Sequence, residues 1–322
     1  MNIIIIGDTS GNPDEAMKKI GLNLSIYLNK INNINSSFLC IEELLINRKK
    51  YKKTDIIHYM TGPSWRSFIY LFLLKILFRC KSVISFIHPE ESFKTILFFK
   101  LFTPDGVIVQ SDKWLEKVKL TNCKVTDIPL VGIKEKFTAI DENKKKNIRN
   151  ELQLPLDKII VLHVGHLNKG RKLDIFKQFE TLDFIYPLII ASTTVKADKD
   201  LVKELKKHKI NIIHKFIPNI EKYYQAADHY IFPTIDERFC IQIPLSVIEA
   251  YACGLNIIST PFGGLPKYLT NNNRNITYTN KINNIINYIK HNKRKENLNT
   301  QIINKFNWIN ISNDLVNFYQ KL

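Results

Sequence analysis

The chain has 322 residues, which suffices for two domains of about 150 residues each. Its hydrophobic fraction of 45% excludes a disordered chain, and its charged fraction of 24% is ordinary for a folded one. The formal net charge of +17 favours anionic partners, but the densest basic runs, at 144–146, 203–209 and 290–295, are expected to be solvated loops or helix surfaces.

The five cysteines lie at irregular spacings, without any Cys-x-x-Cys pair. An odd number of scattered thiols argues against a disulfide framework or a zinc site and is typical of a reducing compartment. The longest apolar stretch, 68–78, contains Lys75 and is too short to span a bilayer. We therefore expect a cytoplasmic protein.

The first half of the chain alternates apolar runs of strand length with segments of helical pattern. Strands are expected at 3–6, 56–59, 82–87 and 107–110, and the helices that follow them at 14–29, 67–79, 93–102 and 112–120. Because these strands are almost entirely apolar, helices should cover both faces of their sheet. The pattern predicts a doubly wound parallel sheet.

A charged stretch at 138–155 interrupts this alternation and is expected to be a linker with a short helix. A second alternation follows, with strands expected at 159–165, 188–191, 210–213, 230–233 and 257–259. The predicted fold class is therefore α/β, with two Rossmann-like domains facing a cleft. Ligands of such sheets bind beyond the carboxyl ends of the strands, so the informative residues should follow strands.

The most specific segment of the sequence is 233–269. Pro244, Leu245 and Ser246 are typical of a helix start, and Gly254 is typical of a helix end. Glu249 lies within this helix between apolar neighbours, where a carboxylate needs a partner. That partner could be a cation in an ion pair, or the hydroxyls of a bound ribose.

Two consecutive glycines, Gly263 and Gly264, follow the next expected strand and precede another helix. Glycines at such a turn let the backbone approach a ligand and offer free N–H groups to an anion. Alone, this feature does not define a site.

In these stretches, SVIEAYACGLNIIST followed by PFGGLP, the chain resembles the C-terminal half of the family 4 glycosyltransferases, which have the GT-B fold. The resemblance implies that Glu249 binds the ribose of a nucleotide-sugar donor, and that Gly263 and Gly264 hold the donor near its sugar and phosphates. It also implies that backbone amides around Leu245 and Ser246 face the diphosphate.

The family usually has a second glutamate upstream, separated from the one in this motif by seven residues, but here that position is Ile241. The nearest upstream acids are Asp236 and Glu237. The resemblance carries the catalytic contact with the donor sugar onto Glu237. The alternative is that Asp236, Glu237 and Arg238 form a surface turn.

The segment after the first strand of the second half is rich in basic residues. The family pattern there is Gly-Arg-Leu, three residues, then Lys-Gly, with both cations gripping the diphosphate. In this chain Gly165 keeps the glycine, His166 replaces the arginine and Arg171 replaces the lysine, with Lys169 as a reserve candidate. Arginine suits a diphosphate because its guanidinium donates two parallel hydrogen bonds. The alternative is a basic loop without a ligand.

In the first half, His58 and His88 each follow an expected strand. In the family, a histidine at the second of these two positions contacts the donor sugar or its phosphate, so the resemblance implies that His88 is the catalytic histidine. His58 could equally be a satisfied residue at a strand end. The resemblance also implies domains at 1–145 on the acceptor side and 146–305 on the nucleotide-sugar side, with a helix at 306–322 that crosses back to the first domain.

The resemblance implies a retaining glycosyltransferase that uses a nucleotide-diphosphate sugar, and we expect it to need neither a metal ion nor a cofactor and to serve the synthesis of a cell-surface glycan or glycolipid. The alternatives are a basic nucleic-acid-binding protein, for which no recognised module is present, and a GT-B nucleotide-sugar epimerase. The segments 65–78 and 93–102 mix aromatic, aliphatic and basic residues. They could pack entirely on the sheet, or they could contact the inner face of a membrane, in which case the acceptor would be lipid-linked.

Overall fold

The computed structural model describes residues 1–10, 16–60, 62–119, 121–270, 275–292 and 300–322. Its contacts divide the chain into two compact units. The first unit contains Met1–Gly132, Ile241–Ile243 and Asn304–Leu322, and the second contains Ile133–Cys240 and Pro244–Ile303. Within the described residues, no helix is both long enough and apolar enough to cross a bilayer.

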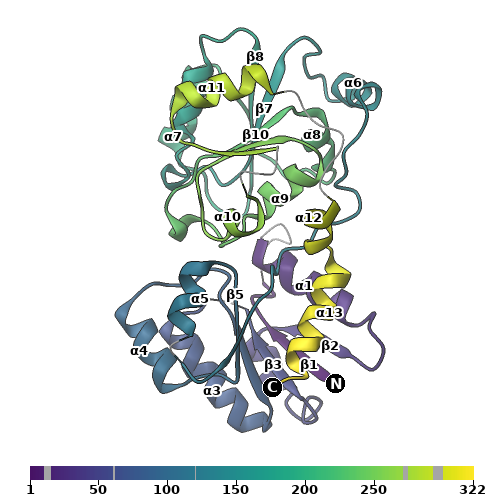
Figure 1. The fold of residues 1–322 in the computed structure, drawn as a ribbon, viewed down its shortest axis with the longest axis vertical. Coiled ribbons are helices and arrows are strands. Elements are labelled where there is room, and N and C mark those ends of the chain that lie inside the picture. The colour runs from purple at the N-terminus through teal and green to yellow at the C-terminus, as the bar shows by residue number, and fades with distance from the viewer. Residues whose placement is uncertain (11–15, 61, 120, 271–274, 293–299) are drawn as a thin grey trace. The chain divides into compact units, whose positions relative to one another are not determined.

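The first unit is built around a parallel sheet (Figure 1). Its strands are β1 (Asn2–Ile6), β2 (Asn35–Leu39), β3 (Ile56–Tyr59), β4 (Lys81–Ser85), β5 (Gly106–Val109) and β6 (Lys124–Asp127), in the order β2-β1-β3-β4-β5-β6. Its helices are α1 (Ala16–Leu28), α2 (Ile41–Ile46), α3 (Trp65–Phe78), α4 (Phe93–Leu101), α5 (Asp112–Val118) and α13 (Trp308–Tyr319).

The central strands of the first unit are largely apolar because the sheet is covered on both faces. In β1, Ile4 pairs with β2 on one side and with β3 on the other, and it is fully buried. The last helix, α13, returns to this unit and packs on α1, where Trp308 stacks on Tyr27 with ring centroids 6.1 Å apart. Gly132 lies against the same Trp308 ring, which leaves no space for a Cβ atom.

The second unit has the same architecture (Figure 1). Its strands are β7 (Ile159–Gly165), β8 (Ile185–Ala191), β9 (Asn211–Ile213), β10 (His229–Phe232), β11 (Asn256–Ser259) and β12 (Ile276–Tyr278), in the order β12-β11-β10-β7-β8-β9. Its helices are α6 (Glu142–Glu151), α7 (Lys199–Lys207), α8 (Glu221–Ala226), α9 (Leu245–Ala252), α10 (Leu265–Tyr268) and α11 (Ile282–His291), with 3-10 turns η1 (Lys169–Arg171), η2 (Leu173–Phe179) and η3 (Glu237–Phe239). A further helix, α12 (Thr300–Lys305), joins the two units.

The strand order of the second sheet reverses between β7 and β10, because β7, β8 and β9 run to one edge while β10, β11 and β12 run to the other. At such a switch point the loops after neighbouring strands diverge to opposite faces and leave room for a ligand beyond their carboxyl ends. The loops after β7 and β10 are the segments that the sequence marks as basic and acidic.

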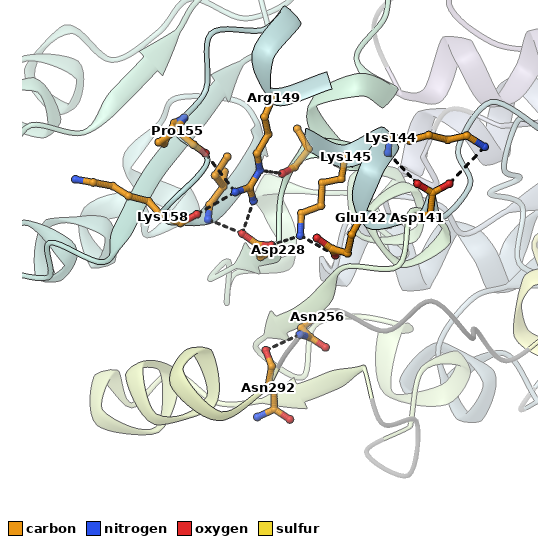
Figure 2. Close-up of polar contacts among 12 residues, drawn as sticks. Asp141, Glu142, Lys144, Lys145, Arg149, Pro155, Lys158, Asp228, Asn256 and Asn292 are labelled. Atoms are coloured by element: carbon orange, nitrogen blue, oxygen red, sulfur yellow. Dashed lines mark hydrogen bonds and ion pairs between the residues drawn. The ribbon is translucent and has the colours of Figure 1, made fainter. Parts of the chain in front are cut away.

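A buried ion network fixes α6 on this sheet (Figure 2). Asp228, just before β10, accepts from Lys145 at 2.5 Å and from Arg149 at 2.6 Å, and it also accepts the backbone N–H of Ile160 at 2.7 Å. Arg149 donates in addition to the carbonyl of Ala226 at 2.9 Å. The expectation that the basic run 144–146 is solvated is therefore wrong for Lys145, which is buried because a carboxylate compensates its charge.

The network also explains where the units divide. The contacts group 133–145 with the second unit, whereas the sequence placed the boundary after 145. Besides the α6 network, Lys136 pairs with Glu221 of α8 at 2.6 Å, and Gln225 donates to the carbonyl of Lys136 at 3.3 Å. Side chains far along the chain thus hold this segment, and local composition does not reveal them.

Most strand predictions match the structure to within a few residues, but β2, β6 and β12 are absent from them. β2 begins with Asn35, Ser36 and Ser37, and β6 is half exposed at the sheet edge, so neither has the apolar run of a central strand. The start of the helix expected at 14–29 lies partly outside the described residues, as do positions 293–295 of the last basic run.

Candidate active site

The turn after β7 places one arginine against the carboxyl end of the strand. Asn168 caps the turn, because its Oδ1 atom accepts the backbone N–H of Arg171 at 3.2 Å. A Cβ atom on Gly165 would lie 3.1 Å from Nε2 of His163 and 4.0 Å from Nη1 of Arg171. The glycine therefore leaves space for the His163 ring beside the strand end, with the guanidinium of Arg171 at van der Waals distance from the same point.

Arg171 is only 6% exposed, yet nothing among the described residues neutralises it. Its Nε atom is buried and has no hydrogen-bond partner in the described part of the chain, and the ring of Phe232 lies 5.7 Å from the guanidinium carbon. A buried cation without a counter-ion is costly unless a ligand supplies the charge. Together with its place at the switch point, this makes Arg171 the centre of a candidate anion site.

Two histidines beside Arg171 are held neutral. Burial lowers the pKa of His163 to about 3, and its ring contacts the carbonyl of Ile231 at 2.8 Å. Burial and the nearby charge of Arg171 lower the pKa of His166 to about 4, and its Nε2 atom lies 3.0 Å from Oγ1 of Thr194. At neutral pH His166 is therefore a hydrogen-bonding group at this site, and Arg171 carries the positive charge.

Lys169 lies in the same turn but is largely exposed, with its Nζ atom 3.9 Å from Asp198. Asp198 and Asp200 form the only Asp-x-Asp spacing in the sequence, a pattern whose carboxylates could hold a divalent cation. Asp198 is instead the N-cap of α7, accepting the backbone N–H groups of Asp200 at 3.0 Å and Leu201 at 3.1 Å. Among the described residues, no group of three or more His, Cys, Asp or Glu side chains is placed to hold a metal ion.

The loop after β10 carries Glu237 to the turn that holds Arg171. Phe239, in the same η3 turn as Glu237, packs so closely on Gly170 that a Cβ atom there would overlap the ring. Asp236 and Arg238 pair with each other at the surface, with a shortest contact of 2.5 Å. The two flanking residues thus form the surface turn that was one alternative, while Glu237 between them is half-buried.

The start of α9 is fastened to the end of β7. The hydroxyl of Tyr230 lies 3.1 Å from the carbonyl of Val164 and 2.7 Å from Oγ of Ser246. Leu245 and Ser246 form the first turn of α9, as expected, and Gly254 follows the helix with a positive φ of 84°. The N-terminal backbone of α9 therefore lies beside the strand end that Arg171 borders.

Glu249 has a specific partner in the second unit. The hydroxyl of Tyr224 in α8 donates to Oε2 of Glu249 at 3.1 Å. Burial, with the charge of Glu249, raises the pKa of Tyr224, so the phenol stays protonated and remains a donor. The bond fixes the direction of a half-buried carboxylate.

The paired glycines follow β11. Gly263 has a φ of 51°, a conformation that glycine adopts without strain, and Gly264 is the N-cap of α10. Phe262 before them packs edge-on against Phe232 of β10, with centroids 5.2 Å apart. Phe232 is the ring that Arg171 faces, so this turn belongs to the same end of the sheet.

The candidate residues of the second unit are thus linked by a continuous set of contacts, from Gly165 and Arg171 through Tyr230 to the first turn of α9. His88 belongs to the first unit, in the loop after β4, where its backbone N–H donates to the carbonyl of Gly62 at 3.2 Å. His58 is a core residue: its Nδ1 atom lies 2.6 Å from the hydroxyl of Tyr319, and Nε2 contacts Ser85. Burial lowers its pKa to about 3.

Sequence reasoning missed the groups that orient the site, namely Tyr224, Tyr230, His163 and Thr194. Tyr230 and His163 lie within predicted strands, and one residue with a polar group among apolar neighbours does not by itself indicate a functional role. Tyr224 lies 25 positions before Glu249, and no local pattern links the two.

Comparison with known proteins identifies the family of proteins to which this chain belongs. The family model of glycosyl transferases group 1 matches residues 144–307, half of the chain and most of the second unit. The chain belongs to this glycosyltransferase family. It is 28% identical over 161 residues to a putative teichuronic acid biosynthesis glycosyltransferase, TuaC, of Bacillus subtilis. That match covers 49% of this chain and 39% of the relative.

Solved structures confirm the expected fold over the whole chain. Anabaena Alr3699/HepE in complex with UDP has a TM-score of 0.78 at 13% identity, and both chains are covered completely. The complex of the same protein with UDP-glucose has a TM-score of 0.76 at 13% sequence identity, and both chains are again covered completely. A glycosyltransferase from Rickettsia africae has a TM-score of 0.78 at 15% sequence identity, and the match covers 99% of this chain and 98% of the other. The predicted GT-B class with two doubly wound parallel sheets is thus confirmed.

Proposed function

We propose that the protein transfers a sugar from UDP-sugar to the hydroxyl of an acceptor, with retention of the anomeric configuration. Family membership supports the transfer of a glycosyl group. The choice of UDP is supported by the fold shared with Anabaena Alr3699/HepE, which was crystallised with UDP and with UDP-glucose.

One observation carries the proposal: the buried guanidinium of Arg171, without a counter-ion among the described residues, lies at the switch point of a nucleotide-binding type of sheet. A donor diphosphate would provide the missing negative charge. Charge accumulates on that diphosphate as the bond to the sugar breaks, so a fixed cation lowers the barrier more than it tightens ground-state binding.

The other residues take roles that fit their surroundings. Glu249, oriented by Tyr224, would accept hydrogen bonds from the ribose hydroxyls, and the backbone N–H groups at Leu245 and Ser246 would face the diphosphate. The turn at Gly263 and Gly264 would approach the donor near its sugar and phosphates. Neutral His166 would donate a hydrogen bond to a phosphate oxygen.

The reaction would proceed through an oxocarbenium-like state, with the acceptor hydroxyl attacking from the face that the diphosphate leaves. Glu237 would contact the donor sugar, and His88 would be the catalytic histidine of the first unit. Arg171 and the α9 N-terminus would neutralise the leaving group, so we propose a metal-independent reaction without a cofactor.

The relative named for teichuronic acid biosynthesis supports a place in the synthesis of a cell-surface polysaccharide. We propose that the acceptor is lipid-linked and that the enzyme acts on it in the cytoplasm, at the inner face of the membrane.

A thermal-shift series with UDP, ADP and GDP, followed by their glucose conjugates, tests the donor. We expect stabilisation by UDP and by UDP-sugars, which the variant Arg171→Met should lose. Stabilisation by ADP or GDP alone would overturn the choice of base, and no response to any nucleotide would overturn the donor site.

Two further assays address the alternatives. A nucleotide-sugar epimerase would interconvert a labelled UDP-sugar without any acceptor, whereas a transferase would release UDP only as sugar is transferred. A nucleic-acid-binding protein would shift labelled DNA or RNA in a gel, with an affinity that falls steeply as salt increases.

A further inference from the structure

Helices α3 and α4 in the first unit lie side by side on the sheet. Their inner sides supply aromatic rings to the core, and the rings of Phe68 and Phe99 lie 5.2 Å apart. Trp65 and Phe98 make a second ring contact at 5.5 Å. Figure 1 shows both helices in the same region of this unit. Because the two helices pack on one another, their outward sides form one surface.

That outward surface, which we name the α3–α4 face, is apolar. Nine of the nineteen exposed large hydrophobic side chains among the described residues belong to it: Tyr70, Phe72, Leu73, Ile76, Leu77, Phe93, Ile96, Leu97 and Leu101. Phe93 is 80% exposed, Leu101 63% and Ile76 59%. A helix that only covers a sheet carries polar residues on its outer side, so this concentration indicates a binding surface.

The charges on the two helices all have one sign. Arg66, Lys94 and Lys100 are exposed, and neither helix contains an aspartate or a glutamate. The fourth cation, Lys75, is tied to Asp105 at 2.8 Å. Of the two glutamates before α4, Glu91 is paired with Lys113 at 2.7 Å and with Lys117.

We infer that the α3–α4 face docks on an anionic lipid bilayer, with its apolar side chains in the boundary of the acyl chains and its cations among the headgroups. Exposed aliphatic and aromatic residues with interspersed lysine and arginine suit that interface. A second copy of the chain fits less well, because it would bring like charges together without an acidic partner on either helix. Neither helix is long enough to insert across the bilayer.

This inference rests on the proposed function only for its purpose, which is to bring the active site to a lipid-linked acceptor. The surface itself is defined by the first unit, and the donor residues described above belong to the second. Vesicle binding without nucleotide therefore tests the docking surface, and UDP binding without vesicles tests the donor site. Either one can fail while the other holds.

The experiment is co-sedimentation of the full chain with vesicles of equal parts phosphatidylglycerol and phosphatidylcholine, compared with vesicles of phosphatidylcholine alone. We expect binding to the anionic vesicles that weakens with salt. Leu73→Gln, Ile76→Gln and Leu101→Gln combined should reduce the partition coefficient at least tenfold. Lys94→Gln with Lys100→Gln should reduce it roughly 30-fold, about fivefold for each cation.

The matched control is Ile26→Gln with Ile46→Gln, which removes exposed apolar side chains from α1 and α2 in the same unit. It should bind vesicles as the parent does, and unchanged UDP binding and circular dichroism should show that every variant is folded. Equal binding to both vesicle types, or full binding by the folded triple variant, would overturn the inference. So would the absence of vesicle binding together with a dimer that the triple variant abolishes.

Discussion

Replacing Arg171 with methionine should change stability and ligand affinity in opposite directions. The side chain is buried, its Nε atom has no hydrogen-bond partner among the described residues, and the guanidinium carbon lies 5.7 Å from the Phe232 ring, whose face stabilises the charge. Methionine has a similar length and no charge. Losing the ring contact costs about 0.5–2 kcal/mol, but the desolvation penalty of several kcal/mol disappears as well.

We therefore expect the free enzyme to gain about 1 kcal/mol in unfolding free energy, or roughly 2–4 °C in the Tm of a domain of this size. UDP affinity should fall by about 2–4 kcal/mol, a factor of roughly 30 to 1,000, because the charged contact with the diphosphate is lost. Differential scanning calorimetry and titration calorimetry measure the two quantities on the same sample.

Lys169→Met is the matched control. It removes a cation from the same turn, but one that is largely exposed and only 3.9 Å from its partner, so both quantities should change by less than about 0.5 kcal/mol. If Arg171→Met lowers stability and keeps the parent's UDP affinity, the guanidinium serves the fold and the diphosphate is held elsewhere.

Three further predictions follow from contacts in the second unit. Asp228→Asn leaves two buried cations without their carboxylate and should lower the unfolding free energy by about 3–5 kcal/mol in urea denaturation; a loss below 1 kcal/mol would contradict the network. Tyr224→Phe removes the donor that orients Glu249 and should weaken UDP binding about 3–10-fold in calorimetry with an unchanged Tm, and equal affinity would refute that orienting role. The pKa of His166, lowered to about 4 in the free protein, should rise when UDP binds, as followed by NMR of its ring protons. Because the unfolded value is about 6.5, the stability from neutral His166 is complete above that pH and is lost as pH falls towards 4; a pKa insensitive to UDP would place the diphosphate away from this ring.

The sequence determined the architecture through its hydrophobic pattern. Strands buried on both faces must be apolar throughout, and most of those in the two sheets could be located from this requirement alone. The edge strands β2 and β6 were not predicted from this pattern. One side of an edge strand meets fewer neighbours, so such a strand tolerates serine and lysine.

The candidate residues of the second unit could also be predicted by position. Ligands of these sheets bind where strands end, so Gly165, Arg171 and Glu249 stood out by their place after strands or at the next helix. What local pattern could not show was the state of each group. The low pKa of His166 comes from burial and from Arg171, and both depend on how the turn folds back on the strand.

Only the tertiary structure decided which charges are buried and which apolar surfaces are exposed. Lys145 lies in a run that resembles solvated surface, yet Asp228, 83 positions further along the chain, compensates its charge in the interior. Helices α3 and α4 are apolar on both sides, so their periodicity could not tell the side that packs on the sheet from the side left open. Burial is a property of pairs of surfaces, and the second surface of each pair is supplied by residues far away in the sequence.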